Sequence, residues 1–166
     1  MDLMLKIYMA GPDVFEQDAV EKGETLKELC RQYGFEGHFS LDNSVSVNDT
    51  PRNIAKAIRE ANLALLESCD IVLANLNPFR GIEPDSGTVY EVGYGAALNK
   101  MVYGYAADRR AMIERVREVQ KLAEGATVCR DGMNIEDFGL SHNLMMLDVV
   151  IADDIKDALA YIRSVL

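Results

Sequence analysis

The sequence of 166 residues predicts a three-layer α/β fold, in which a parallel β-sheet is covered by helices on both faces. Two observations predict it. Short apolar runs of five or six residues alternate with longer segments whose apolar residues recur every three or four positions. The short runs are mostly apolar, which is typical of strands that are buried on both faces of a parallel sheet.

The N-terminal part of the chain predicts two strands and one helix. Residues 5–10 are a short apolar run that ends at Gly11 and Pro12, so they predict a strand. Residues 17–33 have apolar positions at helical spacing and stop before a glycine, so they predict an amphipathic helix. Residues 37–41 are a weaker strand candidate, followed by a polar loop.

The middle of the chain predicts two helices around a central strand. Thr50 and Pro51 begin the first helix, with threonine as N-cap and proline in the first turn, where its missing N–H costs nothing. Residues 71–76 are mostly apolar and predict a strand buried on both faces. A loop over residues 77–87 leads into a second helix over residues 88–99.

The C-terminal part predicts one more strand and two helices. Residues 101–106 predict the strand, and residues 109–123 predict a helix that a polar segment follows. The last helix is predicted to have an inner face made of Ile151, Ile155, Leu159, Ile162 and Leu166. With no repeat or linker, we expect residues 1–166 to form one domain with a flavodoxin-like or Rossmann-like fold.

Composition limits the partners and the compartment. The 27 acidic and 17 basic side chains give a formal net charge of −10, which would repel the phosphate backbone of DNA or RNA. The three cysteines are far apart and form no CxxC pair, which indicates free thiols in a reducing compartment. No signal peptide or membrane span is evident, so we expect a cytoplasmic protein.

The chain lacks the sequence signatures of several enzyme classes. Gly11-Pro12-Asp13 after the first strand is not GxGxxG, which disfavours NAD binding. There is no Walker lysine motif and no GxSxG motif, and His38 and His142 are isolated. Phosphoryl transfer, serine hydrolysis and metal catalysis therefore lose their main support.

Carboxylate chemistry remains. Ligands of such sheets bind beyond the carboxyl ends of the strands, and Glu83, Asp85 and Glu91 lie in or just after the loop that leaves the central strand. Asp85 is placed to cap the helix of Glu91, whose positive N-terminal end favours an ionised nucleophile. The alternative is that Asp85 is only a cap and Glu91 only a solvated helix residue. A face of small residues would instead hold Glu91 rigidly near the sheet: Val89, Val92, Gly93, Ala96 and Ala97.

Four ordered segments together resemble the nucleoside 2-deoxyribosyltransferase family. They are Ile7-Tyr8-Met9-Ala10-Gly11, Leu41-Asp42-Asn43, Asp85-Ser86-Gly87-Thr88-Val89-Tyr90-Glu91-Val92-Gly93-Tyr94, and Asn143-Leu144-Met145. The resemblance covers most of the chain, and the acid six residues before the nucleophile is part of it. Departures from the family lie mainly in the loops, and base choice would depend on the loops over residues 42–48 and 79–85.

The resemblance implies roles for individual residues. Glu91 matches the nucleophile, Tyr8 matches the tyrosine that hydrogen-bonds and orients it, and Asp70 and Asp85 match acids near the base. Asn143 matches an asparagine that reaches the active site of a neighbouring subunit, which implies a homo-oligomer. The further substrate-binding candidates are Gly11, Phe15, Asp42 and Asn43.

From the residues alone, Tyr8 could be a core residue, Asp70 a turn or cap residue, and Asn143 a turn residue. Leu41-Asp42-Asn43 could also be a plain turn, and Arg80 could pair with Glu83 or line the pocket. The residues leave these alternatives open.

The expected activity is transfer of a 2-deoxyribosyl group between nucleobases in nucleotide salvage, with slow nucleoside hydrolysis as a side reaction. Glu91 would attack C1′ while Asp85 or its proton network protonates the departing base, and no metal or organic cofactor is required. One alternative is an N-glycosidase acting on deoxynucleoside 5′-monophosphates, for which the loops offer few phosphate donors beyond Arg80 and Ser86. Another is a nucleotide-sensing module without turnover, which would not need Glu91.

Overall fold

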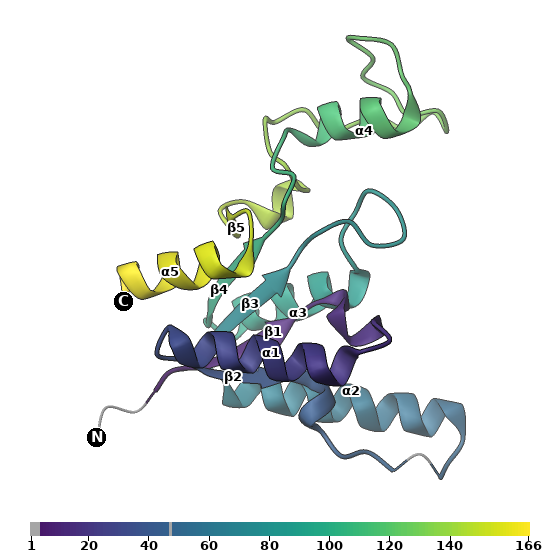
Figure 1. The fold of residues 1–166 in the computed structure, drawn as a ribbon. Coiled ribbons are helices and arrows are strands. Elements are labelled where there is room, and N and C mark those ends of the chain that lie inside the picture. The colour runs from purple at the N-terminus through teal and green to yellow at the C-terminus, as the bar shows by residue number, and fades with distance from the viewer. Residues whose placement is uncertain (1–3, 47) are drawn as a thin grey trace.

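The computed structural model describes residues 4–46 and 48–166, and it confirms the expected three-layer α/β architecture (Figure 1). Within these residues the sheet has five parallel strands in the order β2-β1-β3-β4-β5. The strands are β1 (Lys6–Ala10), β2 (Glu36–Phe39), β3 (Ile71–Asn75), β4 (Met101–Tyr105) and β5 (Val150–Ala152). This strand order is the flavodoxin-like one.

The helices are α1 (Ala19–Gln32), α2 (Pro51–Ser68), α3 (Ser86–Ala97), α4 (Met112–Gln120) and α5 (Ile155–Val165). Helices α1 and α3 agree with their predicted ranges to within two residues at each end, and α2 begins at the predicted Pro51. The expected caps of α2 and α3 are present: Thr50 accepts a hydrogen bond from the backbone N–H of Asn53, and Asp85 accepts one from Thr88. Of the helices in the described residues, none is both long and apolar enough to cross a membrane.

Two predictions at the C-terminal end were wrong. Ile151 was assigned to the inner face of the last helix, but it lies in the short strand β5, because Asp154 caps α5 only after it. The helix expected over residues 109–123 is shorter and ends where Lys121 adopts a left-handed conformation (φ 51°).

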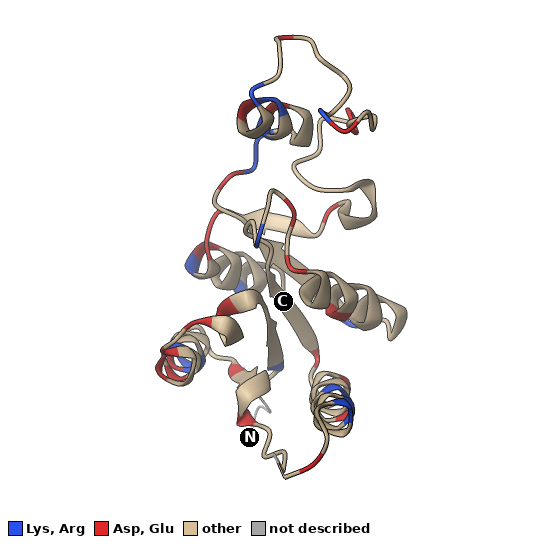
Figure 2. Ribbon diagram, turned by 90° about the vertical axis from the view of Figure 1, so that its right-hand side faces the viewer, with Lys and Arg blue, Asp and Glu red and all other residues tan. Residues whose placement is uncertain are grey.

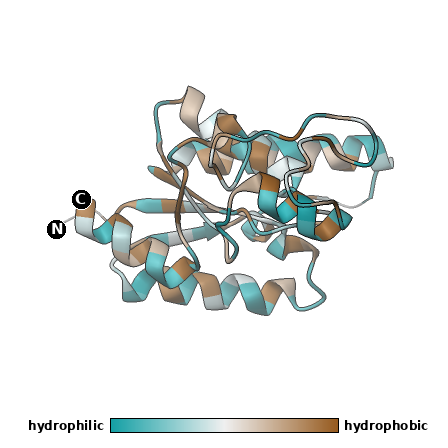
Figure 3. Ribbon diagram, turned by 90° about the horizontal axis from the view of Figure 1, so that it is seen from above, coloured by the Kyte–Doolittle hydropathy of each residue, from teal (hydrophilic) through white to brown (hydrophobic). Residues whose placement is uncertain are grey.

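Two apolar clusters cover the two faces of the sheet. Residues of α1 and α5 pack on one face, against side chains that include Ile7 and Met9 of β1. Residues of α2 and α3 pack on the other face, against Tyr8 and Ala10 of the same strand. Neighbouring side chains of a strand point to opposite faces, so β1 contributes to both clusters. The helices carry bands of hydrophobic and hydrophilic residues (Figure 3), and the charges lie mainly on helices and loops (Figure 2).

The sheet reverses its strand order beside β1. The chain moves outward from β1 to β2 and then returns to place β3 on the other side of β1. Open α/β sheets bind ligands at such a switch point, beyond the carboxyl ends of the strands. Helix α3 follows β3 at this edge, so its first turns are well placed for a ligand (Figure 1).

Helix α4 belongs to a separate small apolar cluster. Its residues Met112, Ile113 and Val116 cluster with Ile135.

Candidate active site

A hydrogen-bonded pair of side chains joins the sheet to α3. Glu91 lies in the second turn of α3, and Tyr8 projects from β1 to the face that α2 and α3 cover. The Tyr8 hydroxyl donates a hydrogen bond to Glu91 Oε1 at 2.6 Å. Tyr8 is fully buried, so this bond fixes the orientation of the carboxylate and leaves Oε2 for other partners.

Burial sets the protonation of both groups. It raises the pKa of Tyr8 well above its usual range, with a further contribution from the negative charge of Glu91, so the hydroxyl stays protonated and donates. Burial also raises the pKa of Glu91 to about 7; the Tyr8 hydrogen bond lowers this pKa and the charge of Asp85 raises it. The helix N-terminus was expected to favour the ionised form, but at this depth the loss of solvation outweighs such effects.

Asp85 is both the N-cap of α3 and a neighbour of Glu91. Its Oδ2 accepts hydrogen bonds from the backbone N–H of Thr88 at 2.8 Å and from the Thr88 hydroxyl at 2.9 Å. Its charge acts on Glu91, as the raised pKa indicates. No described residue donates a hydrogen bond to Oδ1, so one oxygen of Asp85 can serve a ligand while the other caps the helix.

Close packing holds α3 on the sheet, and the glycine that allows it is Gly95, not the expected Gly93. The buried residues of α3 are Thr88, Val92 and Gly95, whereas Gly93 is exposed. A Cβ at Gly95 would lie 2.7 Å from Val72 Cγ2, while a Cβ at Gly93 would meet nothing within 4 Å. The helix therefore approaches β3 at Gly95, which keeps Glu91 near Tyr8.

A cleft of about 440 Å³ opens between α2 and α3 beside Glu91. It is lined by Ala55, Ile58, Arg59, Asn62, Leu63, Gly87, Tyr90 and Glu91. Its size is in the range of small-molecule sites. Arg59, Asn62 and Tyr90 were missed from the sequence; the only signal was that two polar residues of α2 share the helix face of Ile58 and Leu63.

Asn43 reaches this cleft indirectly, whereas Asp42 does not. Asn43 Nδ2 donates a hydrogen bond to Asn62 Oδ1 at 3.0 Å. Asp42 uses both oxygens elsewhere, since Oδ1 pairs with Lys27 Nζ at 2.7 Å and Oδ2 accepts from the backbone N–H of Phe39 at 2.9 Å. These bonds tie the end of β2 to α1. Of the loop over residues 42–48, Val47 lies outside the described residues.

Asp70 is not brought to the cleft. It precedes β3, at the amino ends of the strands, and its Oδ2 accepts a hydrogen bond from the backbone N–H of Lys6 at 2.8 Å. Ligand sites of such sheets lie at the carboxyl ends. Asp70 thus links the beginnings of β1 and β3. This is the structural alternative, a turn or cap residue, that its position in the sequence left open.

Gly11 and Phe15 lie at the carboxyl end of β1. A Cβ at Gly11 would come within 2.6 Å of Asp13 Oδ2 and 2.9 Å of Asn75 Cβ, so a larger residue would force these neighbours to move. Phe15 is 58% exposed and stacks on Phe79 with ring centroids 5.3 Å apart. The Arg80 guanidinium lies over both rings, at 5.4 and 4.5 Å, and no ion pair joins Arg80 to Glu83 among the described residues.

Asn143 lies on the other flank of α3. It is exposed, its Oδ1 accepts from the backbone N–H of Met145 at 3.0 Å, and its Nδ2 donates to Glu136 Oε1 at 3.0 Å. It lines a second hollow of about 270 Å³, together with Ser86 and Val89 of α3. Within one chain, Asn143 is therefore separated from the Glu91 cleft by the helix itself.

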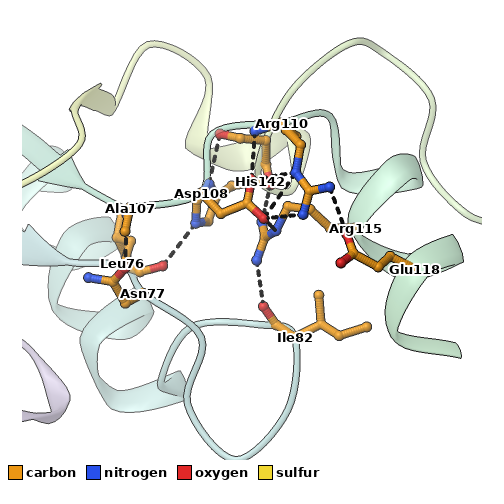
Figure 4. Close-up of polar contacts among 10 residues, drawn as sticks. Leu76, Asn77, Ile82, Ala107, Asp108, Arg110, Arg115, Glu118 and His142 are labelled. Atoms are coloured by element: carbon orange, nitrogen blue, oxygen red, sulfur yellow. Dashed lines mark hydrogen bonds and ion pairs between the residues drawn. The ribbon is translucent and has the colours of Figure 1, made fainter.

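A buried arginine ties these loops together (Figure 4). Arg115 of α4 is 4% exposed and donates hydrogen bonds to the carbonyl oxygens of Ser141 at 2.6 Å and Ile82 at 2.9 Å. His142 is hydrogen-bonded to the carbonyl oxygen of Leu76 at 2.9 Å, and burial lowers its pKa, so its ring is neutral at pH 7. The hydrogen bonds of Arg115 thus connect the loop before Asp85 with the segment that contains Asn143.

The sequence matches the profile of one protein family over residues 7–145, described as nucleoside 2-deoxyribosyltransferase. The chain belongs to this family. A solved 2-deoxyribosyltransferase from Leishmania mexicana is 33% identical, with a TM-score of 0.78, and the match covers 96% of this chain and 97% of that one. The match of sequence and fold over nearly the whole chain supports a deoxyribosyltransferase-type enzyme.

Two further proteins are also similar to this chain. A 2-deoxyribosyltransferase from Bacillus psychrosaccharolyticus is 17% identical with a TM-score of 0.58, over 93% of this chain and 89% of that one, and it shows the shared fold alone. An uncharacterized protein of Schizosaccharomyces pombe, C191.05c, is 34% identical over 122 residues, 72% of this chain. The chain spans 58% of the length of that curated relative.

Proposed function

We propose that this protein transfers the 2-deoxyribosyl group between nucleobases through a covalent intermediate on Glu91. The observation that carries the proposal is the buried Tyr8–Glu91 pair, which borders a cleft of small-molecule size. A solvated helix residue would have no need of a hydrogen bond from a fully buried tyrosine. The family supplies the reaction class, and the substrates are a deoxynucleoside and a free nucleobase.

In the first step, Glu91 Oε2 forms a bond to C1′ and the bond from C1′ to the base nitrogen breaks. The bonding electrons leave with the base, which takes up a proton delivered through Asp85. Tyr8 holds Oε1 throughout, so the nucleophile does not rotate away. A pKa of about 7 leaves roughly half of Glu91 ionised at neutral pH, which suits a group that must attack and later depart.

In the second step, a new base attacks C1′ from the face that the first base left. The bond to Glu91 breaks, and Asp85 accepts the proton of the incoming base, in the reverse of its first role. Two inversions retain the configuration at C1′. Water can take the place of the base, so slow hydrolysis accompanies transfer, and the chemistry needs no metal or organic cofactor.

A second subunit would complete the site. Asn143 is exposed beside a hollow on the flank of α3 that faces away from the cleft of its own chain. Its family counterpart reaches the site of a neighbouring subunit, so we propose that this chain forms a homo-oligomer in the same way. Arg115 would then position this segment for the partner's site.

The test is base exchange by the purified protein. Incubation with 2′-deoxyinosine and free adenine should give 2′-deoxyadenosine and hypoxanthine, followed by chromatography, and water alone should give slower hydrolysis. Glu91→Gln retains an oxygen for the Tyr8 hydroxyl but removes the nucleophile, and should abolish both products. Exchange that survives in this variant, or hydrolysis without any exchange in the wild type, would overturn the proposal.

A further inference from the structure

An arginine side chain lines the cleft beside Glu91. Arg59 of α2 donates a hydrogen bond from Nη2 to the Tyr90 hydroxyl at 2.9 Å, and its guanidinium carbon lies 5.7 Å from the centroid of the Tyr90 ring. Among the described residues no carboxylate forms an ion pair with Arg59. Lys56, one turn away on the same helix, pairs with Glu60 at 3.7 Å. Arg59 is exposed, and it places a cation that no described carboxylate pairs at the edge of the cleft.

The walls of the cleft suit a planar ring. Ala55, Ile58 and Leu63 supply aliphatic surface from α2, and Tyr90 supplies an aromatic ring from α3. A deoxyribosyl group has hydroxyls that would need polar partners on these walls, whereas a nucleobase buries its faces against apolar surface. With C1′ held at Glu91, the base is therefore the part of the nucleoside that occupies the cleft.

Apart from the Glu91 carboxylate, the polar side chains of the cleft offer hydrogen-bond donors. Arg59 has only N–H groups, and the bond to Tyr90 uses one of them. Asn62 accepts from Asn43 through its carbonyl oxygen, which leaves its amide nitrogen as a donor. The cleft therefore favours bases whose edges present hydrogen-bond acceptors.

We propose that Arg59 makes the enzyme selective for 6-oxopurines, hypoxanthine and guanine, an inference that rests on the proposed function. A 6-oxopurine presents two adjacent acceptors, O6 and N7, which match the paired N–H groups of a guanidinium. Adenine presents an amino donor in place of O6, which would face the donors of Arg59. Tyr90 positions Arg59 for this contact, because its hydroxyl accepts a hydrogen bond from Nη2 and its ring makes a cation–π contact with the guanidinium.

The test compares two donors with one acceptor. The donors are 2′-deoxyinosine and 2′-deoxyadenosine, and the acceptor is unsubstituted purine, which has no substituent at C6; kcat/KM is measured for each donor. The wild type should prefer 2′-deoxyinosine by about tenfold or more, as one bidentate contact to a base implies. Arg59→Met should bring the ratio close to one, and Arg59→Lys, which keeps the charge without the fork, should give an intermediate ratio. Lys56→Met is the matched control and should leave the ratio unchanged, since Lys56 does not line the cleft.

A wild type that prefers 2′-deoxyadenosine, or an Arg59→Met variant with the wild-type ratio, would overturn the inference. A binding measurement tests the role of Arg59 independently of base exchange. Calorimetry would measure the binding of free hypoxanthine and adenine to the Glu91→Gln variant, with and without Arg59→Met. Hypoxanthine should bind more tightly only when Arg59 is present, whether or not the wild type turns over. If hypoxanthine and adenine bind equally in the presence of Arg59, the inference fails even though base exchange occurs.

Discussion

Replacing Tyr8 by phenylalanine removes one hydroxyl and should change how the activity depends on pH. The lost bond is a short one, 2.6 Å, between a fully buried donor and the carboxylate of Glu91. A hydrogen bond to a charged group is worth about 1.5 to 3 kcal/mol. This bond lowers the pKa of Glu91, so Tyr8→Phe should move the acid limb of the kcat/KM profile from about pH 7 to higher pH. The same energy corresponds to a displacement of about one to two pH units.

The assay is base exchange measured between pH 5 and pH 9.5. At pH 6 the variant should lose about tenfold to hundredfold in kcat/KM, because fewer Glu91 side chains are ionised. Above pH 9 the difference should shrink to the part that comes from the lost orientation of Glu91. Tyr94→Phe is the control, because Tyr94 lies on the same helix but its hydroxyl contacts Glu67. A loss in Tyr8→Phe that is equal at every pH would refute the reasoning, since it would mean that Tyr8 does not act on the ionisation of Glu91.

Three further predictions concern the same helix. The pKa of Glu91 in the folded protein is raised to about 7, so ionising this side chain costs stability as the pH rises from 4.5 to 7. Glu91→Gln should therefore be more stable than the wild type above pH 7, by up to about 3 kcal/mol. Below pH 4 the two proteins should be equally stable, and urea unfolding measures both differences. Asp85→Asn keeps an N-cap, so its melting temperature should hardly change while kcat falls about 10²- to 10⁴-fold. If the melting temperature falls and the remaining folded protein keeps its kcat, Asp85 is only a cap. Gly95→Ala should lose about 1 to 3 kcal/mol against Val72, whereas Gly93→Ala, with open space around it, should gain up to about 1 kcal/mol, and thermal unfolding of both variants checks the sign.

The sequence predicts the sheet well because buried parallel strands have a strong pattern. The run over residues 71–76 is apolar except for Asn75 and is bounded by polar residues, and β3 lies within one residue of it. Strand β5 has only three residues, too few for any periodicity, and its Ile151 fits the helical spacing of α5 equally well. Its identity as a strand comes from pairing with β4, which is a long-range contact.

The candidate site was predictable in part. Asp85 and Glu91 could be found because a cap and a helix have local signals, and Tyr8 because the family resemblance marks it. Arg59 could not be found, since polar residues on an amphipathic helix are usually solvated and nothing local shows that α3 packs beside it. The wrong glycine was chosen because small and apolar residues lie on several sides of α3, so its buried side has no clear sequence signal.

Trapping the covalent intermediate tests the central claim most directly. Wild-type protein mixed with 2′-deoxyinosine without an acceptor base, and then quenched rapidly with acid, would be analysed by mass spectrometry of the intact chain and of its peptides. A gain of one deoxyribosyl group on the peptide that contains Glu91, removed by adding adenine before the quench, is the predicted result. Base exchange at full rate without this adduct, or with the adduct on another residue, would contradict the account.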